Sequence, residues 1–168
     1  LPIGEEKNFR GVVDLVSRKA FLFQTDESGK FSEGAIPGEM TAAVDAAREA
    51  LIEMVAENDE KLMEKFFEAG TLSDDEIVTG LRAATIAGKI FPLLCTSATL
   101  NIGVQQLLDS ILACLPSPVD RPMRGLDKAG ADIVREADDK KPAAAFVWKT
   151  IADPFAGRIT MFRVASGS

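Results

Sequence analysis

The stretch IFPLLCTSATLNIGVQQLLDSILACL, residues Ile90–Leu115, decides the fold class of this chain. Its first six residues, Ile90–Cys95, form a short apolar run that is typical of a strand covered on both faces. From Val104 to Leu115 apolar residues recur every three or four positions, which predicts a helix with one buried face. A strand, a polar loop and a helix in this order indicate an α/β sheet, in which ligands bind at loops leaving the carboxyl ends of strands.

The loop Thr96–Gly103 lies inside a longer pattern, Cys-x-Ser-Ala-x-x-Asn-x-Gly-Val-Gln-x-Leu-Leu-Asp, which ends in Leu-Pro-Ser-Pro. This pattern resembles the last guanine-recognition loop and helix of the GTPase domain of elongation factor G, a translational GTPase. The resemblance implies that the guanine base is bound by backbone N–H groups at Ser97, Ala98 and Thr99. A Ser-Ala pair alone would be an ordinary strand-to-helix turn, but the whole run at this spacing is far more specific.

Two further stretches resemble the same family. Phe9–Ala20, with the pattern Phe-x-Gly-Val-x-Asp-Leu-Val-x-x-Lys-Ala, is similar to the opening of the subdomain that elongation factor G inserts in its GTPase domain. Thr150–Val164, with the pattern Thr-x-x-Asp-Pro-Phe-x-Gly-Arg-Ile-Thr-x-Phe-Arg-Val, is similar to the first hairpin of the β-barrel domain that follows. We therefore expect both ends of the chain to be cut from a longer protein.

The resemblance implies an α/β architecture in four parts. These are an inserted β-plus-helix subdomain (1–89), the last strand and helix of a P-loop GTPase sheet (90–118), a mobile linker without helical or strand period (119–142) and a truncated β-barrel hairpin (143–168). Without the rest of the sheet, we expect Ile90–Cys95 to pair with the amino-terminal strands or with a second copy of the chain. A lone hairpin is marginal in water, so we expect the last part to pack on a neighbour, to be exchanged between chains or to be poorly ordered.

An acidic stripe marks the helix predicted over residues 39–57. Asp45, Glu49, Glu53 and Glu57 recur every four residues, with only Arg48 to offset them, and like charges at this spacing cost about 0.2–0.5 kcal/mol per pair. The stripe is either a solvated face or a docking surface for a partner. The resemblance implies that the partner is the ribosomal stalk protein, and that the ribosome is the wider assembly.

Composition excludes several kinds of protein. The net charge of −7 argues against a broad nucleic-acid footprint, so we do not expect DNA as a partner. The chain has no His, which excludes a catalytic triad and a His-ligated zinc site. Cys95 and Cys114 fall in apolar runs, where reduced buried thiols are expected. No apolar run reaches membrane-spanning length, so no membrane partner is expected and a cytoplasmic location is predicted.

Other acidic residues have a structural explanation. Ser73-Asp74-Asp75-Glu76 predicts a capping box at the start of a helix, with Leu72 and Ile77 as its hydrophobic staple. Acidic residues in a first helical turn complement the helix dipole and need no metal ion. A small acidic metal-dependent enzyme is therefore a weakly supported alternative.

The motifs that hold phosphates are missing from this chain. It contains neither G-x-x-x-x-G-K-[ST] nor the Asn-Lys-x-Asp stretch that gives this family its main guanine contact. The resemblance implies that GTP or GDP and Mg²⁺ are cofactors of a longer parent. We expect no cofactor, no metal and no catalytic residue in this chain, which alone should neither bind nor cleave GTP. The competing hypothesis is an acidic helical adaptor that binds a partner protein and no nucleotide.

The loop departs from the family pattern. Elongation factor G usually has Gly-Ser-Ala-Phe-Lys-Asn-Lys-Gly where this chain has Thr-Ser-Ala-Thr-Leu-Asn-Ile-Gly, and Ala165 stands where a Tyr is common. A divergent paralogue with altered work on the ribosome is therefore an alternative to a main translocation factor.

Overall fold

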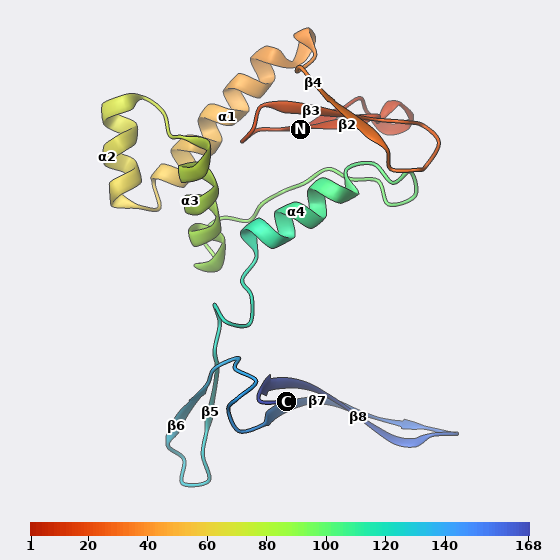
Figure 1. Ribbon diagram of the computed structural model, residues 1–168, viewed down its shortest axis with the longest axis vertical. Helices are drawn as coiled ribbons and strands as arrows, with labels where there is room; N and C mark the ends of the chain where they lie inside the picture. Colours follow the sequence, from red (N-terminus) through yellow and green to blue (C-terminus); the bar gives the residue numbers. More distant parts are fainter. The chain divides into compact units, whose positions relative to one another are not determined.

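The computed structural model describes all 168 residues as a mixed α/β fold with four α-helices and several small antiparallel sheets (Figure 1). The chain divides into two units, Leu1–Leu115 and Pro116–Ser168. None of its helices is both long and apolar enough to cross a membrane.

The first unit begins with a four-stranded antiparallel sheet in the order β1-β2-β3-β4. Its strands are β1 (Pro2–Ile3), β2 (Gly11–Asp14), β3 (Lys19–Phe23) and β4 (Phe31–Gly34), and short 3-10 helices cover Glu6–Asn8 and Gly38–Met40. The β2–β3 hairpin predicted from the sequence is confirmed. Its turn is closed by the Asp14 carboxylate, which accepts hydrogen bonds from the backbone N–H groups of Val16 and Ser17 at 3.1 Å.

Three helices follow the sheet, and sequence signals mark the start of α3 and the end of α2. They are α1 (Thr41–Ala56), α2 (Glu60–Ala69) and α3 (Asp74–Ile86). The predicted capping box is confirmed, because Ser73 accepts from the Glu76 amide while the Glu76 side chain accepts from the Ser73 amide. Helix α2 ends at Gly70, whose φ of 69° is the left-handed conformation that glycine adopts without strain.

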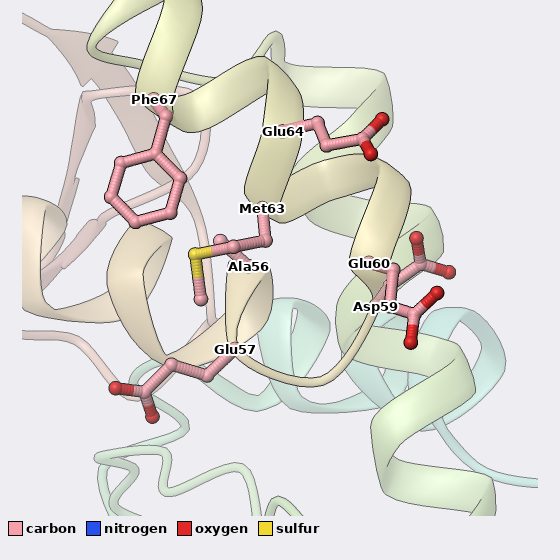
Figure 2. A pocket seen from close by; sticks show the side chains of 7 residues that line it. All are labelled: Ala56, Glu57, Asp59, Glu60, Met63, Glu64 and Phe67. Carbon is pink, nitrogen blue, oxygen red and sulfur yellow. The ribbon is translucent and has the colours of Figure 1, made fainter.

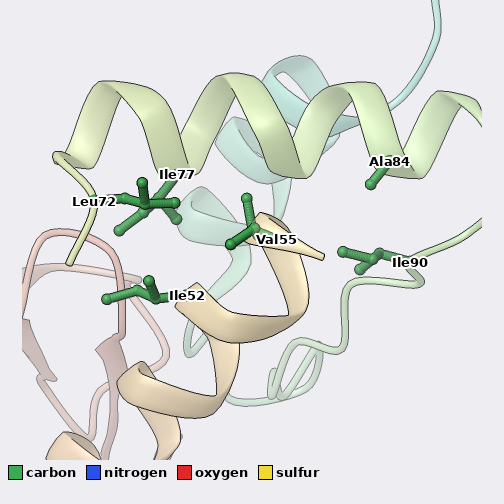
Figure 3. Close-up of a cluster of buried hydrophobic side chains, with 7 residues drawn as sticks. Ile52, Val55, Leu72, Ile77, Ala84 and Ile90 are labelled. Atoms are coloured by element: carbon green, nitrogen blue, oxygen red, sulfur yellow. The ribbon is translucent and has the colours of Figure 1, made fainter. Parts of the chain in front are cut away.

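The helices share one apolar core, shown in Figure 3. The buried members from α1, α3 and their flanking residues are Ile52, Val55, Ala56, Leu72, Ile77, Ala84 and Ile90. Val55 and Ile77 have no exposed surface, and burying side chains of this size stabilises a fold by about 1.5–3 kcal/mol each. Gly80 of α3 faces Val55 of α1 and Leu62 of α2, and its lack of a side chain lets both helices approach α3 closely.

Helix α4 (Val104–Cys114) follows the segment Ile90–Cys95, and the expected pairing of this segment with the amino-terminal strands is wrong. Its pairing with a second copy of the chain stays a prediction. The segment is extended but belongs to no strand, and it pairs neither with the amino-terminal strands nor with any other. Ile90 is buried and Cys95 packs half-buried against another cluster, while Phe91 and Leu93 are 83% and 94% exposed. The chain supplies no neighbouring parallel strand, so the backbone groups of this apolar run find no ladder to join.

The second unit corrects the prediction for residues 119–142. These residues form a hairpin of β5 (Met123–Leu126) and β6 (Asp132–Arg135) instead of an irregular linker. The Asp127 carboxylate orders its turn by accepting from the backbone N–H groups of Ala129 and Ala131 at 2.8 and 2.9 Å. This hairpin is ordered by hydrogen bonds in its turn. Since such bonds leave no hydrophobic periodicity in the sequence, the two strands were not predicted.

The predicted carboxyl-terminal hairpin is present as β7 (Ala144–Asp153) and β8 (Gly157–Ser166). The two strands pair with each other and with no other strand, and their large apolar side chains, including Trp148 and Phe162, are exposed. The hairpin therefore pairs with no other strand of the chain, while its packing on another molecule or its exchange between chains stays a prediction.

Candidate functional site

The predicted guanine-recognition loop is a tight turn closed at its base. Ser97 and Ile102 form an isolated antiparallel bridge, in which the Ser97 amide donates to the Ile102 carbonyl at 2.9 Å and the Ile102 amide donates back at 3.0 Å. Asn101 has a φ of 53° and Gly103 a φ of 72°, so the chain turns through the left-handed region twice. A side chain at position 103 would place its Cβ 2.9 Å from the Cys95 carbonyl oxygen, which makes glycine necessary there.

The base of the loop is anchored in the sheet. Ile102 is only 2% exposed and packs in a cluster with Val12 of β2 and Phe23 of β3. The tip is different, because Ala98, Thr99 and Leu100 are all exposed. The loop is therefore held firmly at its ends and presents its middle to solvent.

The three predicted guanine-binding residues differ in whether their backbone N–H groups are free to bind a ligand. The Ser97 amide already donates to Ile102, whereas the amides of Ala98 and Thr99 donate to no acceptor in the protein. The Ser97 hydroxyl lies 3.4 Å from both the Thr99 hydroxyl and the Leu100 amide, which keeps it within the loop. Only the N–H groups of Ala98 and Thr99 are thus available to a ligand, and the small Ala98 side chain leaves room for a flat ring.

A shallow hollow of about 540 Å³ lies beside the base of this loop. Leu94, Cys95 and Thr96 form one side of it, and the amino-terminal segment forms the other through Pro2, Gly4, Glu5, Glu6 and Phe9. Its only charged side chains are the two carboxylates, and it offers no cation to a phosphate group.

The four residues of the acidic stripe lie along α1 as predicted, but they do not share one environment. Asp45 forms an ion pair with Arg18 at 2.6 Å, whereas Glu49, Glu53 and Glu57 are exposed and have no ion pair. Arg48 does not offset the stripe as expected.

Arg48 instead turns inward, with its side chain 13% exposed. Its Nη1 donates to the carbonyl oxygens of Leu15 (2.5 Å) and Val16, and its Nη2 contacts Asp74 at 2.7 Å. This residue therefore ties the β2–β3 turn to α1 and to the start of α3.

The carboxyl end of α1 and the first turns of α2 enclose an acidic hollow of about 350 Å³. Met63 and the 78% exposed Phe67 line it together with four acidic residues, Glu57, Asp59, Glu60 and Glu64. In Figure 2 Glu57 lies on the same side as Met63 and Phe67, and the other three carboxylates point away from them. Sequence reasoning found Glu57 but missed the α2 residues, because their place depends on the angle between two helices. Residues 1–115 hold 19 acidic and 10 basic residues, a net charge of −9, so the surroundings of the hollow are also negative.

Neither cysteine has the environment of a nucleophile. Both are free thiols, and burial raises the pKa of Cys114 above its ordinary value. No three His, Cys, Asp or Glu side chains lie close enough together to hold a metal ion.

Sequence reasoning also missed two side chains beside the loop. Asn101 and Gln105 both donate to backbone carbonyls of the turn between β3 and β4, more than 70 residues earlier in the chain. No local pattern predicts such a contact.

No protein-family model matches this chain. Its fold is similar to that of the protein ttk003000868 from Thermus thermophilus, known from a crystal structure, with a TM-score of 0.76 and 29% sequence identity. The match covers 99% of this chain and 22% of the Thermus protein, so the chain spans less than a quarter of that protein's length.

Proposed function

We propose that this chain is the closing part of the GTPase domain of a translational GTPase similar to elongation factor G, followed by the start of a β domain. The single observation that carries the proposal is the loop Ser97–Gly103. Its sequence resembles the guanine-recognition loop of that family, and its exposed tip offers the unused N–H groups of Ala98 and Thr99. In this proposal β1–β4 and α1–α3 form the inserted subdomain, and the protein works on cytoplasmic ribosomes.

The role of the chain in nucleotide binding follows from its donors. The Ala98 N–H group donates to the carbonyl oxygen of guanine, an interaction that adenine cannot accept because it carries an amino group at that position. The side chains that hold the phosphates and Mg²⁺ belong to other parts of the full-length protein. Mg²⁺ supplies charge neutralisation at the phosphates.

One such hydrogen bond is too weak to hold a nucleotide by itself. Its net contribution is about 0.5–1.5 kcal/mol, less than the cost of immobilising a ligand of this size. We therefore expect calorimetric titration of GDP into the 168-residue chain to give no micromolar affinity, and titration into the full-length protein to give one. Micromolar binding to the isolated chain would show that the site has been misread.

A substitution at the tip tests the site itself. In the full-length protein, Ala98→Leu places a bulky side chain where the base approaches and should weaken GDP binding by about tenfold or more. Ala83→Leu is the matched control, because Ala83 is an exposed alanine on α3 and far from the loop in sequence. Equal GDP affinity for both variants would remove the guanine site from the loop.

A second candidate function is supported by the acidic hollow. We propose that α1 and α2 dock a basic protein element that inserts an apolar side chain beside Met63 and Phe67, the ribosomal stalk protein being the partner suggested by the resemblance. An exposed aromatic side chain in a hollow that four acidic residues also line fits such a partner better than a merely solvated face does. This docking belongs to the same protein and does not depend on nucleotide.

Charge reversal separates docking from a solvated face. Glu53→Lys combined with Glu57→Lys should weaken binding to the stalk protein by about tenfold or more, since rim charges that complement a partner steer its association. The control pair, Glu39→Lys with Asp109→Lys, changes the net charge equally on other exposed parts of the unit. The same affinity for both double variants would favour a solvated face.

A further inference from the structure

The turn between β3 and β4, residues 26–30, lies against the predicted guanine-recognition loop (Figure 1). Gln105 Nε2, from the first turn of α4, donates to the Gly29 carbonyl at 3.1 Å. Asn101 Nδ2 points to the Glu27 carbonyl at 3.4 Å. One side chain of the loop, Asn101, and one from the start of α4, Gln105, are therefore held by the backbone of one hairpin turn.

The turn is itself well ordered by local bonds. The Asp26 carboxylate accepts from the Ser28 amide at 3.1 Å and from the Ser28 hydroxyl at 2.6 Å, and the Ser28 hydroxyl accepts from the Lys30 amide at 3.2 Å. Gln24 and Lys30 close the turn through a backbone bond of 2.9 Å. A turn braced in this way presents its carbonyl groups in fixed positions.

The contact between the turn and the loop leaves no spare room. Gly29 has a φ of 70°, and a Cβ added there would lie 2.5 Å from Asn101 Nδ2 and 3.0 Å from Gln105 Nε2. Asn101 is itself in the left-handed region, which few residues other than glycine, Asn and Asp adopt readily. Its backbone N–H also points back to the Ala98 carbonyl at 3.4 Å. A displacement of the Asn101 side chain is therefore passed directly to the peptide group that leads into Thr99.

We propose that the hairpin turn Glu27–Gly29 is a positioning element that fixes the guanine-recognition loop through Asn101 and Gln105, and so sets the affinity for guanine nucleotides. The inference rests on the proposed function of the loop. The turn touches no nucleotide and acts by holding the Ala98 and Thr99 amides at the geometry that a hydrogen bond requires, because such bonds weaken steeply when the donor is misaligned. The inserted β-sheet is then part of the nucleotide site as well as the support for the helices.

The test uses the full-length protein and measures its GDP affinity by calorimetry. Gly29→Ala pushes the Asn101 side chain aside and should weaken GDP binding by about threefold to tenfold, the loss expected for one misaligned hydrogen bond. Gly70→Ala is the matched control, because Gly70 has a φ of 69° but nothing within 4 Å of an added Cβ. It carries the same backbone strain and should bind GDP like the wild type.

Two further variants separate positioning from general destabilisation. Asn101→Gly removes the donor to the Glu27 carbonyl while keeping a residue suited to the left-handed region, so it should weaken GDP binding with Gly29 unchanged. Gln105→Met removes the donor to Gly29 without backbone strain and should weaken GDP binding even if Gly29→Ala does not fold.

The outcomes distinguish this inference from the proposed function beneath it. A wild-type protein that binds no GDP overturns both. A wild-type protein that binds GDP, with Gly29→Ala and Gln105→Met matching Gly70→Ala in affinity, overturns the inference alone. Weakened binding in Gly29→Ala, Gln105→Met and Asn101→Gly, with Gly70→Ala unchanged, supports it.

Discussion

Gly80 offers the sharpest test of how α1, α2 and α3 are held together, because two opposed effects of known size meet there. A Cβ at position 80 would lie 2.5 Å from Val55 Cγ1 and 2.7 Å from Leu62 Cδ1, and carbon atoms in contact normally stand about 3.5–4.0 Å apart. Replacing an interior helical glycine by alanine gains about 1 kcal/mol of helix propensity. Overpacking a filled core costs about 1–3 kcal/mol. We expect the cost of overpacking to exceed the gain in helix propensity, so that Gly80→Ala lowers the free energy of unfolding by about 1 kcal/mol.

The measurement is urea unfolding followed by far-ultraviolet circular dichroism, with Thr79→Ala as the control. Thr79 is the exposed neighbour of Gly80 on α3, so its replacement gains helix propensity without any overlap and should stabilise by a few tenths of a kcal/mol. The slope of unfolding free energy against urea should stay unchanged, since neither variant alters the surface exposed on unfolding.

A double-mutant cycle identifies the cause. Val55→Ala alone should destabilise by about 1–3 kcal/mol because it leaves a cavity, but it also opens the space that a methyl group at position 80 needs. The two substitutions together should therefore cost less than their sum by at least about 0.5 kcal/mol. A stabilising Gly80→Ala that is additive with Val55→Ala would refute the account of close packing at this position.

Two other residues give predictions that solution measurements check directly. Arg48→Met should lower the free energy of unfolding by about 1–3 kcal/mol, because the half-buried carbonyls of Leu15 and Val16 lose their donor. Arg48→Lys should lower it by less. A Met variant as stable as the wild type in urea would contradict this. Glu76 accepts from Lys65 and from Ser73, and these bonds lower its pKa from 4.5 to about 2. Because the folded-state pKa is lowered, the stability it contributes is present above about pH 4.5 and is lost as the pH falls towards 2. Glu76→Gln should flatten the pH dependence of stability in this window, and parallel curves for the two proteins would count against the assignment.

Local signals in the sequence predicted the helices and the main hairpins well. Ser73 and Glu76 form the capping box that their spacing indicates, and Gly70 ends α2 in the left-handed conformation. Such signals succeed because the interacting groups lie within about four residues of one another, so tertiary context has little to add.

Sequence reasoning failed where the outcome depends on distant partners. Arg48 was expected to offset the acidic stripe of its own helix, but its guanidinium reaches the β2–β3 turn because two carbonyl groups there need a donor. The interior glycine of α3 lowers helix propensity, and nothing local in the sequence indicates that side chains from two other helices, Val55 and Leu62, pack against it. For the candidate site, the pattern predicted the loop residues, but it did not predict the contacts of Asn101 and Gln105 with the β3–β4 turn.

The failure at Ile90–Cys95 has a different origin, which the exposed apolar side chains make clear. Phe91 and Leu93 on this segment, and Leu108 and Leu112 on the following helix, are all exposed. A hydrophobic pattern indicates which side chains are suited to burial. Whether a strand forms depends on whether its backbone finds hydrogen-bond partners. Helix α4 satisfies its backbone internally and forms with an exposed apolar face; the extended segment needs a neighbour for every backbone bond and remains unpaired. On the proposed function, that neighbour is the remainder of a GTPase sheet, and the same sheet would cover both apolar surfaces while holding the phosphates of the nucleotide whose base lies at Ala98.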